Sequence, residues 1–414
     1  MTATLGDICE AIVDCEHKTA PPGDGYALSV GTRAMKNGRL VTDACKPVSE
    51  ATYEAWTRRM RPKPGDLILA REAPVGQVVV VPEGQRLCLG QRTVLIRPAV
   101  AEVQPRFLHY WLLGPDAQGT MAAQAAGATV AHLNVDDIRN FDVGGMPRDP
   151  HLQAFTATTL GAIDDLIENN RRRIDLLEQI TKAIYREWFV HLRYPGFEYS
   201  TLVDSALVPT PQDWRVTTIS EVASVNAVSR APGRGETIRY LDISCLGDRT
   251  LSSPTAVAGE NAPGRARRVV RPGDVVWSMV RPGRRAHALL VEPGDDWIAS
   301  TGVAVLSSRR ISTALLFEAV SAPTFSDYLV SQEGGSAYPA VKPADFGSAP
   351  FVLPPDALDR AFDDAVSPMH RLGWRLRELS ERLAAVRDLL LPKLVTGQID
   401  VSKLDLEPLV DSVA

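Results

Sequence analysis

The chain has 414 residues, more than one hydrophobic core usually supports, so its length predicts two or three domains. Hydrophobic residues make up 45% and charged residues 23%, as in ordinary globular proteins, and no apolar stretch reaches the roughly eighteen residues that suit a membrane helix. The formal net charge of −5 gives no general support for nucleic-acid binding, and without a visible signal peptide we expect a cytoplasmic protein with no membrane partner.

The N-terminal segment "DCEHK" is the first stretch with chemical character. Asp14, Glu16 and Lys18 loosely resemble the acidic-acidic-lysine set of metal-dependent nucleases, in which two carboxylates hold Mg²⁺ and a water. Such sets usually place a strand and a turn between the first aspartate and the other two residues. An autonomous nuclease therefore stays open as an alternative function.

The cysteines argue against a disulfide framework and against a zinc module. Their number is odd and none forms a C-x-x-C pair; they are Cys9, Cys15, Cys45, Cys88 and Cys245. Cys9, Cys15 and His17 have a spacing that matches no common metal site. We predict no metal site.

An internal repeat is the main feature of the central sequence. "PKPGDLILAREAPVG" and "RPGDVVWSMVRPG" share a Pro-Gly-Asp turn, and the two turns begin 208 residues apart, at Pro64 and Pro272. "GATVAHLNVDDI" from Gly127 and "GSAYPAVKPADF" from Gly335 have the same separation. The sequence therefore predicts two similar globules.

Both copies mix strands and helices. The runs "DLILA" and "QVVVV" correspond to "DVVWSM" and "HALLV", each bounded by turn residues, and helical segments follow at "PRFLHYWLL" and "TALLFEAV". Asp66 and Asp274 of the turns are expected to be structural residues rather than DNA contacts. We predict a mixed α/β (α+β) fold.

Each copy is followed by a segment with the period of a long helix. In the second, apolar residues alternate at spacings of three and four, which is typical of a coiled-coil seam. The first has a wider stripe and places Asn170 at a seam position, a device that fixes register. The predicted seam residues are Ile163, Ile174, Leu177, Ile184, Met369, Leu372, Leu376, Leu379, Leu383 and Val386.

Motifs for catalysis are missing from the sequence. It contains no G-x-x-x-x-G-K, no G-x-G-x-x-G after a strand, no H-E-x-x-H, no G-x-S-x-G and no Asn-Pro-Pro-aromatic run. Basic residues instead cluster in the second half, which indicates a local positive surface or a solvated face: Arg265, Arg267, Arg268, Arg271, Arg281, Arg284 and Arg285. A large duplicated chain without catalytic motifs indicates recognition rather than catalysis.

Nearly the whole chain resembles the specificity subunits of Type I restriction-modification enzymes. "VDCEHKTAP" resembles the family's Asp-Gly-x-His-x-Thr-Pro opening, with Cys15 in place of the glycine. "LGQRTVLIRP" and "GATVAHLN" resemble a central strand and a polar loop of that family. "AIDDLIENNRRRIDLLEQITKAIYREWFV" and "RDLLLPKLVTGQIDV" resemble its two helix signatures and are the most specific matches.

The resemblance implies an organisation with a pseudo-twofold internal repeat. Two target-recognition domains would be separated by two long antiparallel coiled-coil helices. The expected segments are recognition domain 1 at 1–150, a central helix at 151–193, recognition domain 2 at 194–355, a C-terminal helix at 356–395 and a tail at 396–414.

The resemblance also implies a non-catalytic subunit that reads a bipartite DNA target. Its expected partners are double-stranded DNA, two modification (methyltransferase) subunits and restriction (motor-nuclease) subunits. S-adenosylmethionine, ATP and Mg²⁺ would belong to those partners, and this chain would hold no cofactor. A structural coiled-coil adaptor is a further alternative.

The candidate DNA contacts are short polar groups in loops and the basic cluster. In the first globule Arg suits guanine and Gln or Asn suits adenine. The predicted set comprises His17, Lys18, Thr19, Gln91, Arg92, Thr129, His132, Asn134, Arg281, Arg284, Arg285, Tyr338 and Lys342.

Overall fold

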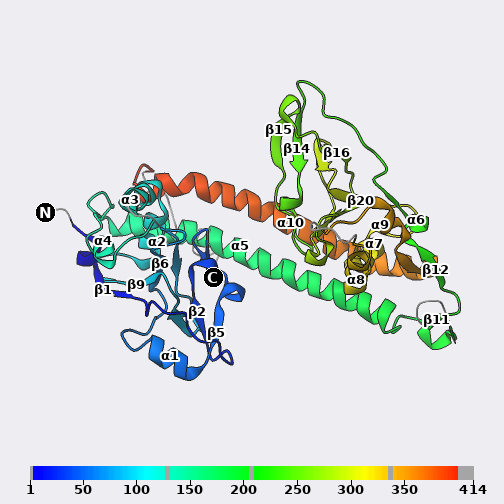
Figure 1. Ribbon diagram of the computed structural model, residues 1–414. Coiled ribbons are helices and arrows are strands. Elements are labelled where there is room, and N and C mark those ends of the chain that lie inside the picture. Colours follow the sequence, from blue (N-terminus) through cyan, green and yellow to red (C-terminus); the bar gives the residue numbers. More distant parts are fainter. Residues whose placement is uncertain (1–2, 126–130, 205–208, 334–338, 400–414) are drawn as a thin grey trace. The chain divides into compact units, whose positions relative to one another are not determined.

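The computed structural model describes residues 3–125, 131–204, 209–333 and 339–399. It divides into two compact units: unit 1 comprises residues 1–169 and 380–414, and unit 2 comprises residues 170–379. In Figure 1 the globule of unit 1 is drawn in blue to cyan and that of unit 2 in green to orange. The five predicted segments stay a prediction, since each long helix contributes to both units.

Unit 1 contains two sheets and short helices. Its strands are β1 (Cys9–Asp14), β2 (Ala27–Val30), β3 (Met35–Lys36), β4 (Arg39–Leu40), β5 (Lys46–Val48), β6 (Leu67–Ala70), β7 (Val78–Val80), β8 (Leu87–Leu89) and β9 (Thr93–Pro98). Its short α-helices are α1 (Glu50–Trp56), α2 (Pro105–Leu113), α3 (Pro115–Ala125) and α4 (Val135–Arg139). The larger sheet has the antiparallel order β1-β9-β6-β7, and the smaller has the order β5-β2-β8, with β3 and β4 pairing separately.

Unit 2 has corresponding elements. Its strands are β10 (Leu202–Val203), β11 (Thr210–Pro211), β12 (Arg215–Thr218), β13 (Ala223–Val225), β14 (Thr237–Leu241), β15 (Thr255–Ala258), β16 (Ala266–Val269), β17 (Asp274–Ser278), β18 (His287–Leu290), β19 (Trp297–Ser300), β20 (Val303–Ser308) and β21 (Pro350–Leu353). Its short α-helices are α6 (Ile219–Val222), α7 (Thr313–Val320), α8 (Pro323–Ser331) and α9 (Pro343–Ser348).

The sheets of the two units repeat one topology. The order β13-β20-β17-β18 in unit 2 matches β1-β9-β6-β7 in unit 1, and both sheets are antiparallel. The second sheet, β15-β14-β19-β16, repeats β5-β2-β8 with one added strand, and its inner pair β14 and β19 is parallel like β2 and β8. The duplication predicted from the sequence is therefore a duplication of fold.

The two Pro-Gly-Asp turns have the same geometry. Gly65 and Gly273 take left-handed φ angles of +88° and +85°, which glycine adopts most readily. Asp66 and Asp274 are each 3% exposed, and each accepts a hydrogen bond from the backbone N–H three residues earlier, at 2.8 and 2.7 Å. Both aspartates thus close a turn that leads into a buried strand.

The long helices are α5 (Pro150–Tyr185), which continues into a π-helical turn η4 (Arg186–Val190), and α10 (Asp356–Val395). Within unit 2 an aromatic cluster joins them, with the Phe189 and Phe362 rings 5.0 Å apart and Tyr185 6.2 Å from Phe362. Tyr185 contacts Phe362, and Glu178, earlier in α5, lies 4.0 Å from Arg377, later in α10. Because positions that decrease along α5 contact positions that increase along α10, the two helix segments run antiparallel. Among the described helices, none combines the length and hydropathy needed to cross a bilayer.

Of the six predicted seam residues of α10, one is buried, three are exposed and two are half-buried. Leu376 is 5% exposed, whereas Leu372, Leu379 and Val386 are 39, 47 and 46% exposed. The physical reason is that α10 also packs on the globule of unit 2, through a stripe with a spacing of four or eight residues at Phe362, Val366 and Trp374. The predicted seam residues of α5, Ile163, Ile174, Leu177 and Ile184, are all half-buried, as are Met369 and Leu383 of α10.

In unit 1 the helices are held by a charged cluster at Asp164 of α5. This carboxylate accepts hydrogen bonds from the Tyr110 hydroxyl at 2.7 Å and from Arg387 of α10 at 2.9 Å, and Arg39 lies 3.3 Å away. Burial would raise the pKa of Asp164, but these donors and positive charges lower it. The ionised carboxylate therefore links α5 to both α10 and the globule.

Unit 2 uses a more deeply buried cluster at Glu318 of α7. Arg249 donates two hydrogen bonds to this carboxylate, at 2.7 and 3.0 Å, and both side chains are 1% exposed. His370 of α10 lies 2.9 Å from Glu318, and the Arg249 guanidinium lies 4.3 Å from the centre of the Phe317 ring. Burial would raise the pKa of Glu318, but the hydrogen bond to His370 and the charge of Arg249 bring it down to about 2.

We expect Glu318→Gln to destabilise the protein by about 3–5 kcal/mol, because it removes the buried carboxylate that accepts two hydrogen bonds from Arg249 and leaves only Glu178, at 3.8 Å, opposite that charge. Since the folded pKa of about 2 lies below the ordinary carboxyl value, this stabilisation is present at neutral pH and is lost as the pH falls through about 2. Urea denaturation followed by tryptophan fluorescence measures the loss. Glu221→Gln is the control, because its pair with Arg215 is exposed and is worth about 0–1 kcal/mol; equal losses for both variants would contradict this account.

Candidate nucleic-acid interface

In unit 1, polar loops gather where β6 ends and β9 begins. The Arg71 N–H donates to the Arg92 carbonyl at 2.9 Å, and the Leu133 N–H donates to the Arg71 carbonyl at 2.9 Å. Glu72 forms an isolated antiparallel bridge with His132. Three segments far apart in the sequence thus meet at one edge of the larger sheet.

The loop after β1 joins this edge through Gln91. The Gln91 side-chain amide donates to the His17 carbonyl, and its oxygen accepts a hydrogen bond from the Thr19 hydroxyl, both at 3.0 Å. His17, Lys18, Thr19 and Gln91 are all exposed. The structure therefore brings four predicted contact residues together, and it uses Gln91 to tie the loop to the start of β9.

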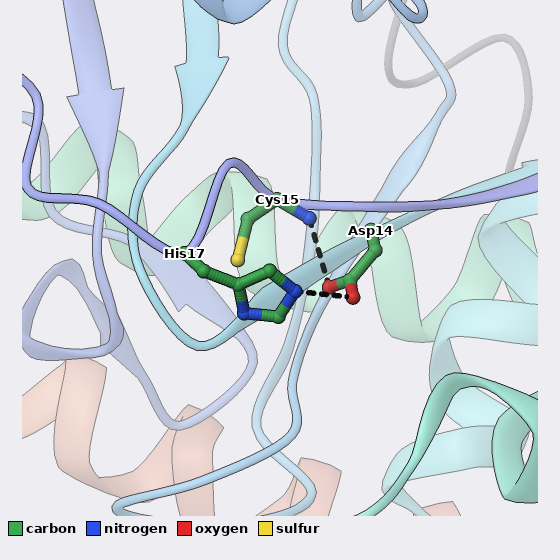
Figure 2. A group of neighbouring side chains, drawn as sticks. All are labelled: Asp14, Cys15 and His17. Carbon is green, nitrogen blue, oxygen red and sulfur yellow. Dashed lines mark hydrogen bonds and ion pairs between the residues drawn. The ribbon is translucent and has the colours of Figure 1, made fainter.

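Asp14 holds the base of the same loop (Figure 2). Its carboxylate lies 2.8 Å from His17 Nε2 and 3.2 Å from Arg71 Nη1, and it accepts a hydrogen bond from the Cys15 N–H at 2.9 Å. The possible ligand atoms of Asp14, Cys15 and His17 lie within 4.8 Å of one another. Because Arg71 already neutralises the carboxylate, we assign no metal here; Cys9 lies outside the group, and burial raises its pKa to about 12.

The nuclease set considered above does not form a free acidic pair. Asp14 is paired with Arg71, and Glu16 lies 3.8 Å from both Arg58 and Arg59. A metal-dependent nuclease needs carboxylates that are free to bind the cation. The geometry gives no support to this alternative.

Arg92 stands directly before β9 with an exposed side chain. Its Nε lies 3.0 Å from Glu72 Oε1, and its φ angle of +70° lies in the left-handed region. His132, whose backbone forms the bridge with Glu72, is half-buried. Glu72, the partner of both residues, was not predicted from the sequence.

Two predicted contact residues also begin short helices. The Asn134 N–H and side-chain amide donate to Asp137 at 2.9 and 3.0 Å, which caps α4. In unit 2 the Lys342 N–H donates to Asp345 at 2.6 Å, at the start of α9. Asn134 therefore has a structural role here, while the Lys342 side chain is exposed.

The predicted arginines of unit 2 lie at the matching edge, in the segment after β17. Arg284 is exposed, and Arg281 is exposed with a φ angle of +52° and an N–H that donates to the Pro339 carbonyl at 2.8 Å. Arg285 is half-buried and donates to the Ser321 carbonyl at 2.7 Å. Its guanidinium is thus occupied within the fold, which makes Arg284 the better candidate for a phosphate contact.

Two predicted residues, Thr129 and Tyr338, lie outside the described residues. Sequence reasoning missed Arg71 and Glu72, although one signal was available. In "LILARE" the two residues come directly after the four buried residues of β6. Charged residues in that position emerge at the end of a buried strand, where binding residues are common.

No protein-family model matches the chain. The chain is 21% identical over 366 residues to the Type I restriction enzyme MjaIX specificity subunit of Methanocaldococcus jannaschii, and this match covers 86% of the chain and 82% of that relative.

One solved structure shows a similar fold. The S subunit of a Type I restriction-modification system from M. genitalium matches with a TM-score of 0.56 at 13% identity, over 95% of this chain and 96% of that one. The HsdS subunit from Thermoanaerobacter tengcongensis matches over 96% of this chain and 97% of that one, at 18% identity and a TM-score of 0.35. The first match confirms the predicted mixed α/β class, and the sequence match shows that the chain is similar to a specificity subunit of a Type I restriction enzyme over most of its length.

Proposed function

We propose that the chain is the DNA-recognition and scaffold subunit of a Type I restriction-modification complex and carries no catalytic site of its own. The observation that carries the proposal is the repeated fold, in which the polar loops of both units lie at the same edge of equivalent sheets. Similarity to a specificity subunit over 86% of the chain supports the same assignment. Each unit would read one half of a bipartite target in double-stranded DNA.

The chemistry at the two edges suits DNA. Exposed Lys18 and Arg284 can contact phosphates, and Arg92 and Gln91 carry the groups that recognise base edges in the major groove. Short loops on a rigid sheet allow such contacts to vary while the scaffold stays constant. This arrangement supports recognition over the adaptor alternative.

Exposed apolar residues on the long helices support the scaffold role. Within unit 2, Leu176 and Ile180 of α5 lie one turn apart and are 57 and 44% exposed, and Leu372 and Leu379 of α10 share a face. We assign these faces to the two modification subunits, with restriction subunits joining the complex. S-adenosylmethionine, ATP and Mg²⁺ would be bound by those partners, in the cytoplasm.

The central test is recognition of separate half-sites. We expect the full chain, co-purified with its modification subunits, to methylate a bipartite sequence selected from a randomised DNA library. His132→Ala should relax the bases of one half-site only, because the side chain lies in unit 1. Equal relaxation of both half-sites would mean that the substitution damages assembly, and methylation without sequence preference would refute the proposed function.

The scaffold role predicts a selective assembly defect. Leu176→Asp combined with Ile180→Asp should abolish co-purification of the modification subunits, because carboxylates would be buried at the contact. The thermal unfolding temperature should change little, since both side chains are exposed in this chain. Gln179→Asp, at an exposed neighbouring position of α5, is the control for a single added carboxylate; unchanged co-purification in the double variant would place the partner elsewhere.

The phosphate assignment of Arg284 predicts a change in salt dependence. Arg284→Glu should weaken DNA binding and reduce the slope of log affinity against log salt by about 1, because fewer counterions are released. Arg310→Glu is the control, since Arg310 is exposed beyond the opposite end of β20. Equal slopes for the two variants would mean that Arg284 makes no phosphate contact and is an ordinary solvated residue.

A further inference from the structure

The backbone framework at the loop edge of unit 1 recurs in unit 2. The Met279 N–H donates to the Gly302 carbonyl and the Val341 N–H donates to the Met279 carbonyl, both at 2.9 Å. Val280 forms an isolated antiparallel bridge with Ala340. These contacts repeat those of Arg71, Arg92, Leu133, Glu72 and His132, so the equivalent positions of the two units are defined by hydrogen bonding.

The side chains on this framework differ in one respect. Four neighbouring positions that are charged or polar in unit 1 are apolar or glycine in unit 2: Arg71, Glu72, Arg92 and His132 correspond to Met279, Val280, Gly302 and Ala340. Since unit 2 builds the same edge without them, the polar groups are not required to form it. They are therefore available for a task that only unit 1 performs.

The backbone of Arg92 has a left-handed conformation that is unfavourable for residues other than glycine. A φ angle of +70° is uncommon outside glycine, and such residues gather at functional sites. The arginine side chain is nevertheless 52% exposed and makes an ion pair with Glu72, whose side chain is 24% exposed. A long cationic side chain is thus held in place at a surface position where a glycine would be less strained.

The contact with Glu72 lies at one side of the guanidinium. Glu72 Oε1 is 3.0 Å from Arg92 Nε, whereas Nη1 and Nη2 form the two-donor edge that can pair with guanine O6 and N7. The carboxylate also offsets the charge of Arg92, which weakens its attraction to phosphates relative to a free arginine. Both effects favour a base contact over a backbone contact.

We propose that Arg92 reads a guanine in the half-site of unit 1 and that Glu72 is its positioning residue. This inference rests on the proposed function and deepens it. It assigns a specificity role to Glu72, and it confines this mode of guanine reading to one half of the target, because unit 2 has Gly302 and Val280 at the equivalent positions.

The test uses the full chain in complex with its modification subunits and a randomised DNA library. Arg92→Gly and Glu72→Val introduce the residues that unit 2 carries on the same framework, and Glu72→Gln keeps an acceptor oxygen for Nε. Glu54→Gln is the matched control, because Glu54 pairs with Arg61 on the exposed surface of unit 1. Thermal unfolding of each variant reports on folding.

We expect Arg92→Gly to lose preference for guanine at one position of one half-site, by roughly 5- to 150-fold. Glu72→Val should lose part of that preference, and Glu72→Gln should restore most of it, with the other half-site unchanged. If Arg92→Gly instead lowers affinity equally for all sequences and leaves the base preference unchanged, Arg92 is a phosphate contact and the proposal is overturned. If Glu72→Val behaves like Glu54→Gln, the positioning role is overturned, whereas a wild-type complex without sequence preference would refute the proposed function itself.

Discussion

Burial of the central strand on both faces is the constraint on which each unit depends. All residues of β6 and of β17 are buried, and each strand is hydrogen-bonded to a neighbour on both sides. Such a strand has no room for groups that need water or a ligand. Polar chemistry in unit 1 therefore lies just beyond the strand end, at Arg71 and Glu72, whereas the equivalent residues of unit 2 are the apolar Met279 and Val280.

Duplication separates what must stay constant from what can vary. The Pro-Gly-Asp turns, the strand order and the backbone bonds at the strand edge are the same in both units. The side chains at that edge differ between the two units. Such a difference changes the surface of a unit without changing its sheet. One scaffold used twice can thus present two different surfaces.

Sequence reasoning reached the features that depend on local pattern. The repeat, the structural role of Asp66 and Asp274 and the two long helices follow from turn chemistry and periodicity, and the fold agrees with them. The Glu72 and Arg92 pair could not be predicted, because it joins residues next to the ends of two strands, β6 and β9, whose pairing the sequence does not state. Exposure of Leu372 and Leu379 was missed for a similar reason, since a heptad pattern does not reveal that the helix also packs on a globule.

The order in which the units can fold follows from the path of the chain. Unit 2 is a continuous stretch, whereas the core of unit 1 includes Leu394 and Val395, which pack with Phe155 and Leu160. A ribosome releases the N-terminal globule long before these two side chains exist, so the core of unit 1 stays incomplete until almost the whole chain is synthesised. The second unit in the sequence is therefore the first that can close its core, and the first unit waits for the C-terminal part of α10.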